Sequence, residues 1–379
     1  MKLKLYSTIT KIDKTHWNTI SGSEFPFSEY DFLLTLEKSG SVGRNSGWHP
    51  LYLTLWQEKV MLGANILYSK TNSYGEYIFD WQWAQAYQAH GQDYYPKIVS
   101  AIPFTPATGH KLLLHPNADR GMVVSRLIAG AKQLVNKMNC QSLHYLFIHP
   151  SELADFHDNG MVIRHSVQFH WRNQNYDSFD GFLARLKSRK RKQIIKERQE
   201  VQKSGITITR LSGEQLNDEH ASIMAEFYLD TIKQKQAIPY LSKLFFKQIF
   251  KIFSHNIILI LASHNGNWVA GALSFCKGGK LFGRYWGCNS QYRYLHFELC
   301  YYQLIEIAIN SKIRMVEAGA QGPHKVQRGF LPELTYSAHH IEDSDFKKAI
   351  NQYITIEKKH IWAELEDMRS YSPYRVLVD

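Results

Sequence analysis

One order of strands and helices occurs twice along the 379 residues of this chain. In the first half, apolar periodicity predicts strands at 111–115, 143–148 and 161–171 and helices at 122–138 and 151–158. The second half predicts strands at 206–211, 257–263, 269–276, 280–287, 314–318 and 335–341 and helices at 214–232, 241–253 and 295–310. Strands that alternate with helices are typical of crossover units in α/β domains. The sequence therefore predicts an α/β protein built from two related halves.

A basic segment at 182–205 lies between these halves. Its cations include Lys187, Arg189, Lys190, Arg191, Lys192, Lys196 and Arg198. A thin apolar stripe predicts a helix with one packed face and a broad cationic face. Such a face attracts phosphate-rich partners, although a merely solvated helix has the same composition. The predicted domains are 1–172, a linker and basic helix at 173–205, and 206–379 with a closing helix.

The charge balance limits the partners of the chain. A net charge of +11 indicates an anionic partner, such as nucleic acid, a nucleotide, a cell-wall precursor or an acidic lipid surface. The four cysteines are scattered without a CxxC pair, so we expect reduced thiols and a cytoplasmic protein. His339 and His340 lack further ligands at metal spacing, so no metal is predicted. The longest apolar run, 257–262, is far shorter than the about 20 residues that cross a bilayer.

The stretch from 281 to 332 carries the strongest candidate site. A predicted strand at 314–318 is followed by a loop with Gly319, Gly322 and Gly329. Around these glycines lie Glu317, Gln321, His324, Lys325, Gln327 and Arg328. A junction between strand and loop is where an α/β sheet usually binds its ligand. A solvated turn would collect the same residue types, and this alternative stays open.

The segment 74–101 is the most aromatic part of the chain. It carries Glu76 and Asp80 among its rings, together with Trp81. Aromatic residues at this density usually build a core, but acids embedded among them would have perturbed pKa values. The segment is therefore either core or a platform for a bulky ligand.

Several strings of the chain resemble a known family. They read YGEYIFDWQWAQAY, YYPKIVSAIPFTPATG, QFHWRNQNYDSFDGFLARLKSRKRKQIIKER, GRYWGC, LHFELCYYQLIEIAI and EAGAQGPHKVQRGFLP. These strings resemble the FemAB-like family, described as peptidoglycan biosynthesis/recognition proteins, and each half resembles the acyltransferase fold of the GNAT superfamily. The resemblance implies an α/β fold with mixed sheets, arranged as tandem GNAT-like acyltransferase domains. By position, the resemblance also aligns the basic segment at 188–199 and Lys325 with motifs of the family.

The acyl donor stays open between two classes. The Fem ligases that the family resembles transfer an aminoacyl group from charged tRNA, but 214–253 shows no long coiled-coil arm like theirs. GNAT enzymes instead hold acyl-CoA on a Gly-rich loop at a helix N-terminus, where backbone N–H groups face the pyrophosphate. The first half offers Arg120 and Gly121 at the equivalent loop, and the second half, at 291–295, offers no glycine. The predicted donors are therefore acyl-CoA or aminoacyl-tRNA.

Amide formation assigns roles to these residues. It needs a neutral amine, a carbonyl held about 3 Å from it and positive groups around the developing oxyanion. Glu317 or His324 is the predicted base. Lys325 or Arg328 is predicted to stabilise the oxyanion or to bind an anionic substrate, and Arg328 is counted among the predicted substrate-binding residues. Glu317 could instead pair with Arg284, and His324 could cap a turn. The other predicted substrate-binding residues are Arg284, Tyr285, Gln321, Glu76, Asp80 and Trp81, and the predicted anion-binding residues are Arg120, Gly121, Arg189, Lys190, Arg191 and Lys192.

Two functions of different classes follow from these observations. The first is an N-acyltransferase that transfers an acyl or aminoacyl group to an amine of an anionic acceptor, such as a peptidoglycan precursor. The second is a non-catalytic recognition module that binds an anionic cell-wall precursor or nucleic acid. Transfer RNA is a partner only if it is the donor, and the oligomeric state is not predicted.

Overall fold

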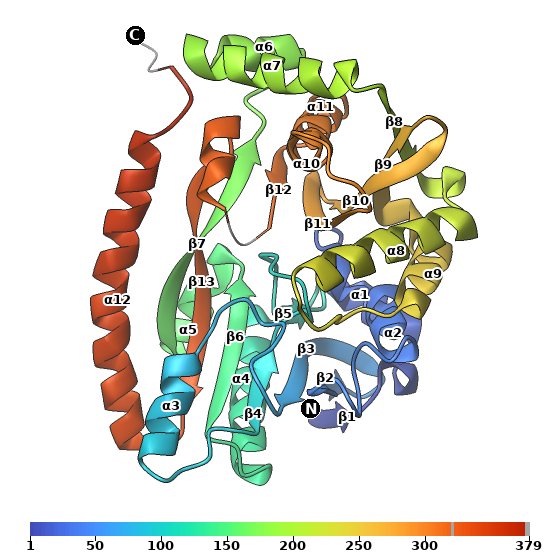
Figure 1. Ribbon diagram of the computed structural model, residues 1–379. Coiled ribbons are helices and arrows are strands. Elements are labelled where there is room, and N and C mark those ends of the chain that lie inside the picture. Colours follow the sequence, from blue (N-terminus) through green and yellow to red (C-terminus); the bar gives the residue numbers. More distant parts are fainter. Residues whose placement is uncertain (320–321, 376–379) are drawn as a thin grey trace. The chain divides into compact units, whose positions relative to one another are not determined.

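The computed structural model describes residues 1–319 and 322–375 (Figure 1). The chain forms two compact units. Unit 1 contains Met1–Val167 and Leu334–Ala363, and unit 2 contains Gln168–Glu333 and Glu364–Asp379. Within the described ranges no helix combines the length and the apolar character that crossing a bilayer requires.

Unit 1 is built on a mixed sheet. Its strands are β1 (Lys2–Tyr6), β2 (Trp48–Gln57), β3 (Val60–Lys70), β4 (Lys97–Ser100), β5 (Leu112–Leu114), β6 (Ser142–Ile148) and most of β13 (Leu331–Ile341). Neighbours β1 to β4 pair antiparallel, β4 pairs parallel with β6, and β6 pairs antiparallel with β13. Its helices are α1 (Lys14–Ser21), α2 (Tyr30–Lys38), α3 (Trp81–Ala89), α4 (Arg120–Lys137), α5 (Leu153–Asp158) and most of α12 (Ser344–Ser370).

Local sequence signals explain these elements. The β2–β3 hairpin turns at Glu58, whose φ of 53° is the left-handed conformation that a tight turn requires. Asp119 caps the N-terminus of helix α4, because its carboxylate accepts the backbone N–H of Met122 at 3.1 Å. Its apolar face, which includes the fully buried Val123 and Leu127, packs in the core of unit 1.

Unit 2 repeats the same strand order. Its strands are β8 (Ile206–Ser212), β9 (Ile257–His264), β10 (Asn267–Lys277), β11 (Lys280–Cys288), β12 (Met315–Glu317) and the end of β7 (Val162–Arg172). Neighbours β8 to β11 pair antiparallel, β11 pairs parallel with β12, and β12 pairs antiparallel with β7. Its helices are α6 (Phe179–Ala184), α7 (Ser188–Lys203), α8 (Asp218–Gln234), α9 (Lys243–Ile252), α10 (Leu295–Phe297) and α11 (Gln303–Asn310), with a π-helical turn, η6 (Glu298–Tyr302), between the last two.

Short 3₁₀ helices complete the chain. They are η1 (Ile9–Lys11), η2 (Pro26–Ser28), η3 (Pro150–Glu152), η4 (Gly213–Gln215), η5 (Ser254–Asn256) and η7 (Pro323–Arg328). The last of these forms the polar loop that the sequence marks as a candidate site.

The predicted duplication of mixed α/β sheets is confirmed. The compact units nevertheless divide the chain at other positions than the predicted domains. The strand β7 begins in unit 1 and ends in unit 2, and β13 begins in unit 2 and ends in unit 1. The last strand of each half is therefore shared between the two units, residues 334–363 belong to unit 1, and the basic segment belongs to unit 2.

Candidate active site

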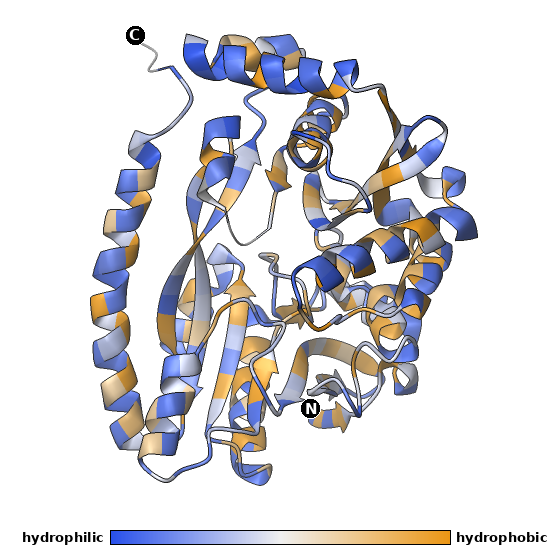
Figure 2. Cartoon of the chain, in the orientation of Figure 1, coloured by the Kyte–Doolittle hydropathy of each residue, from blue (hydrophilic) through white to orange (hydrophobic). Residues whose placement is uncertain are grey.

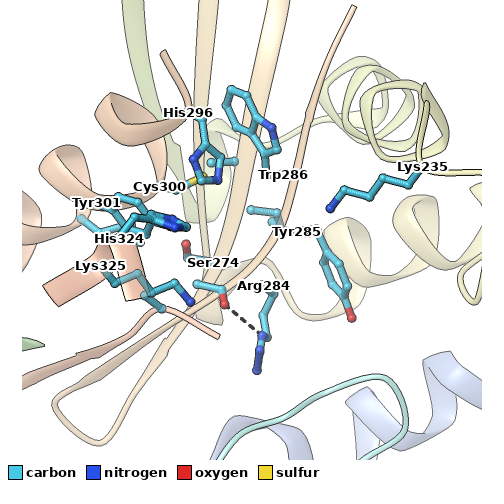
Figure 3. A pocket seen from close by; sticks show the side chains of 15 residues that line it. Lys235, Ser274, Arg284, Tyr285, Trp286, His296, Cys300, Tyr301, His324 and Lys325 are labelled. Atoms are coloured by element: carbon cyan, nitrogen blue, oxygen red, sulfur yellow. Dashed lines mark hydrogen bonds between the residues drawn. The ribbon is translucent and has the colours of Figure 1, made fainter. Parts of the chain in front are cut away.

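A cavity of about 340 Å³ lies in unit 2. It is lined by residues of β10, β11, α10, η6, α11 and η7 and by the loop that follows α8. In Figure 3, His324 and Lys325 enter it from one side, and Lys235 and Tyr285 from the other. The cavity therefore includes the strand-to-loop junction that the sequence indicates.

The sheet and one glycine shape this cavity. β12 ends at Glu317, where it pairs with Phe282, whereas β11 continues to Cys288, so the two parallel strands separate beside the cavity. A Cβ atom on Gly287 would lie 1.9 Å from the carbonyl oxygen of Phe227 in α8. Only glycine permits this approach. The absence of a side chain at Gly287 lets α8 pack on β11, and Lys235, the residue directly after α8, lines the cavity.

The charges around the cavity are of one sign. Lys235, Arg284 and Lys325 line it, and among the described lining residues none is acidic. Aromatic walls are contributed by Tyr285 and Trp286 of β11 and by Tyr301 of η6, among others. A cavity with this lining is complementary to a ligand that carries both a negative charge and a planar or apolar part.

Lys325 is held inside the protein. Its side chain is 3% exposed, and its Nζ donates a hydrogen bond to the carbonyl oxygen of Gly319 at 3.1 Å. The same Nζ lies 5.9 Å from the ring centre of Phe169. Burial, together with the nearby charge of Arg284, lowers the pKa of Lys325 from 10.5 to about 8. The ammonium group of Lys325 therefore lies at the cavity wall and loses its proton more readily than that of an exposed lysine.

Two histidines line the same cavity. Nε2 of His324 lies 3.0 Å from the hydroxyl of Tyr301, and burial lowers the pKa of His324. Burial also lowers the pKa of His296, to about 4, and its ring packs edge-on against Trp286 with centres 5.1 Å apart. Both imidazoles are thus neutral at pH 7 and able to accept a proton.

Sequence reasoning did not assign Lys235, Trp286, His296 or Tyr301 to the site. The spacing of His296 and Cys300, four residues apart on one helix, is a signal that could have placed them on one face. No comparable pattern in the sequence indicates Lys235, because this residue is brought to the cavity by the packing of α8 on β11.

Arg328 does not line the cavity. Arg328 is buried, and its Nη2 donates to Oε1 of Glu197 in α7 at 2.8 Å. Its Nη1 donates to the carbonyl oxygen of His324 at 2.9 Å, and its Nε donates to the hydroxyl of Tyr302 at 3.0 Å. The hydroxyl of Tyr302 in turn donates to Glu197. Glu197, which sequence reasoning missed within the basic segment, therefore anchors both η7 and η6.

The remaining predicted residues of this loop have different positions. Glu317 is 2% exposed at the end of β12, beside His170 of β7, and it does not line the cavity. Arg284 and Tyr285, predicted to bind substrate, line the cavity. Gln321 lies outside the described residues.

The predicted residues of the aromatic segment belong to unit 1. Glu76 and Asp80 are buried and both form ion pairs with Lys97, at 2.9 Å for Glu76. Burial raises the pKa of Glu76 to about 7. Trp81 is 39% exposed and stacks on Phe79. The carboxylates of Glu76 and Asp80 therefore pair with the buried ammonium group of Lys97, and Trp81 lies at the surface.

The two predicted anion-binding segments lie in different units. In unit 1, Arg120 begins α4, with Gly121 after it, and forms an ion pair with Asp155. In unit 2, α7 is mostly hydrophilic (Figure 2), with Arg189 and Lys192 exposed. Its Lys190 donates from Nζ to Oε1 of Gln327 in η7 at 3.0 Å. One face of the basic helix thus contacts the loop that carries Lys325.

The strand order of the two units defines the class of protein. Each unit has four antiparallel strands, then a parallel neighbour reached through a helix, then an antiparallel last strand, which is the mixed sheet of a GNAT-like fold. A cationic cavity beside the parallel pair accompanies it in unit 2. The chain is therefore a tandem GNAT-like α/β protein, as the sequence predicts.

Solved structures share this fold. The chain resembles FemX with 11% identity and a TM-score of 0.55, over 93% of this chain and 100% of that one. It resembles the C-terminal domain of a putative lysylphosphatidylglycerol synthetase from Agrobacterium fabrum with 8% identity and a TM-score of 0.57, over 92% and 97%. L-PGS from Bacillus licheniformis matches with 10% identity and a TM-score of 0.52, over 82% and 91%. At these identities the likeness concerns the fold alone.

The sequence identifies the family. A family model described as peptidoglycan biosynthesis/recognition matches residues 8–376. The chain belongs to this FemAB-like family, which confirms the resemblance carried by its strings. A search of curated proteins gave no match to the chain.

Proposed function

We propose that the protein is an N-acyltransferase that works in the cavity of unit 2. It transfers an acyl or aminoacyl group to an amine of an anionic acceptor, for which a peptidoglycan precursor is the best candidate. The observation that carries the proposal is the buried ammonium of Lys325 at the wall of a cavity with three cations and no acid among its described lining residues. Membership of the FemAB-like family supports the acceptor class.

The residues of the cavity fit the steps of acyl transfer. The nitrogen of the acceptor amine attacks the carbonyl carbon of the donor, and the carbonyl oxygen becomes an oxyanion. The ammonium of Lys325 stabilises this negative charge, which is greater in the transition state than in the bound donor. The attacking nitrogen loses a proton to a neutral imidazole, and His324, next to Tyr301, is the proposed base. The C–O or C–S bond of the donor then breaks, and the leaving oxygen or sulfur takes a proton.

Arg284 and Lys235 have a binding role in this proposal. Both are cations of the cavity, and neither is needed for proton transfer. They hold the negative charge of the donor or acceptor while the reacting carbonyl lies near Lys325. The donor is either acyl-CoA or aminoacyl-tRNA, since both carry phosphates.

Thermal-shift measurements followed by product analysis test this function. Acetyl-CoA, longer acyl-CoAs and charged tRNA are compared, since a ligand at about 100 times its Kd stabilises the fold by about 2.7 kcal/mol. The donor that stabilises the protein should, with a soluble anionic precursor, give a product whose mass has increased by the acyl group. Arg284→Met should reduce the stabilisation, and Lys251→Met, which removes an exposed cation of α9, should not. Ligand-induced stabilisation without any product would instead support the non-catalytic recognition module.

The basic face of α7 should strengthen the binding of a polyanionic substrate. Replacing Lys190, Arg191 and Lys192 together by glutamine should weaken binding of tRNA or a polyphosphate and flatten its dependence on salt. Each lost phosphate contact lowers the slope of log K against log salt by about one unit. Fluorescence anisotropy over a salt series measures both effects. An unchanged affinity and slope would mean that α7 is only a solvated helix.

A further inference from the structure

A second cavity lies in unit 1, between α3 and α12, and has a volume of about 520 Å³. This size is within the range of small-molecule sites, about 300–1000 Å³. We propose that it binds an organic ammonium ion with an apolar body. The proposal does not depend on the transfer activity, because every residue that it uses belongs to unit 1.

The floor of this cavity is apolar and comes from one face of each helix. α12 contributes Phe346, Ala349, Ile350 and Tyr353, at the spacing of one helical face. α3 contributes Trp83 and Ala86. Below them, the ring of Tyr87 stacks on Phe346 with centres 3.8 Å apart and planes at 13°. This ring stacking holds α3 and α12 against each other, so the side chains that line the cavity are fixed in position.

The aromatic lining favours a cation. The rings of Phe346 and Tyr353 line the cavity, and an ammonium ion is attracted to the negative face of such rings. Trp83 also lines the cavity, but the guanidinium of Arg164 already lies 5.2 Å from the centre of its ring. An apolar substituent on the nitrogen would at the same time cover the exposed floor beside Ala86 and Ala349.

The charged groups at the rim favour the same ligand. Asp343 and Asp345 line the cavity, and among its described lining residues none is lysine or arginine. Oδ1 of Asp343 accepts the backbone N–H groups of Asp345 and Phe346, both at 2.9 Å, so the positive end of α12 is already capped. Asp345 contacts Lys348 at 3.0 Å, but both side chains are highly exposed, and such pairs contribute little. In a chain of net charge +11, this lining is the reverse of that in unit 2.

Calorimetric titration with a matched set of aromatic ligands tests the proposal. The probe is benzyltrimethylammonium, and the controls are benzyl alcohol, which is neutral, and phenylacetate, which is anionic. We expect saturable binding of one probe molecule, with both controls at least about tenfold weaker, at low ionic strength where charges are little screened. Phenethylammonium distinguishes the source of the ligand. Tighter binding than the probe indicates a primary amine, and weaker binding indicates a quaternary headgroup.

Variants locate the binding in this cavity. Ala349→Trp fills it from an exposed position and should abolish binding of the probe. Asp343→Asn keeps a residue that caps helices and removes the charge, so binding should weaken about fivefold. Gln352→Ala, at an exposed position of α12 outside the lining, should bind like the parent. The proposal is overturned if no saturable binding occurs, if benzyl alcohol binds as tightly as the probe, or if Ala349→Trp, folded by circular dichroism, still binds it.

Discussion

Lys325→Met is expected to lower the turnover number by about 10²- to 10³-fold, the usual effect of removing one oxyanion partner. Methionine keeps the length of the side chain and removes the charge. Because the ammonium acts on the transition state, the loss should appear in kcat and much less in KM. Steady-state kinetics with the donor found by thermal shift measures both constants. A loss in KM alone would mean that Lys325 only binds substrate.

The fold should survive this substitution. Burial opposes the charged form of Lys325, as its pKa of about 8 indicates, so replacing it by an apolar side chain removes an unfavourable buried charge. The hydrogen bond to Gly319 is lost, but the ammonium is not part of an ion pair among the described residues. Arg284→Met serves as the matched control in the same cavity, and there we expect KM to rise and kcat to change less.

The pH dependence gives an independent check. The proposed role needs the protonated lysine, so turnover should fall as the pH rises through about 8. The free energy of unfolding should change in the opposite sense to turnover and rise as the pH increases. Between about 8 and 10.5 the unfolded chain keeps a proton on Lys325 that the folded protein has lost, so the free energy of unfolding rises with pH over this range. Lys325→Met should lack both effects, and an identical pH profile in parent and variant would contradict the assignment.

Glu197→Gln is expected to destabilise the protein by about 3–5 kcal/mol and to impair turnover with it. The side chains of Glu197 and Arg328 are 4% and 5% exposed, and removing one partner leaves a buried charge without compensation. The guanidinium of Arg328 also holds the carbonyl oxygen of His324, so its displacement should move the proposed base. Urea denaturation and kinetics of the same preparation measure the two effects.

Two further variants test whether the loss of stability comes from the buried pair of Glu197 and Arg328 or from any change of charge in helix α7. Glu200→Gln, a residue of the same helix outside this cluster, should change stability by no more than about 0.5 kcal/mol. The double variant Glu197→Leu with Arg328→Met removes both charges, and its cost should be smaller than the sum of the single costs. A Glu197→Gln protein as stable as the parent would show that the contact with Arg328 contributes nothing.

Local patterns in the sequence determined most of the secondary structure. The apolar patterns at 257–263 and 280–287, which predict strands, became β9 and β11. The predicted helix at 295–310 is continuous but contains the π-helical turn η6, which no local signal marks. The strings of the chain were also sufficient to place it in its family.

Only the tertiary structure decided which charged groups meet. Sequence places Glu197 in a basic segment and Arg328 in a polar loop, and nothing local reveals that they form a buried pair. Proximity in the sequence likewise suggested that Glu317, Lys325 and Arg328 act together, whereas among these three only Lys325 lines the cavity. The division of β7 and β13 between the two units was equally hidden, because apolar alternation predicts a strand and not its neighbours. The sequence by itself determined most of the helices and strands and the family, and it indicated the loop that carries Lys325 as a candidate site. The cavity was decided by long-range packing, which brings Lys235, His296 and Lys325 to one space.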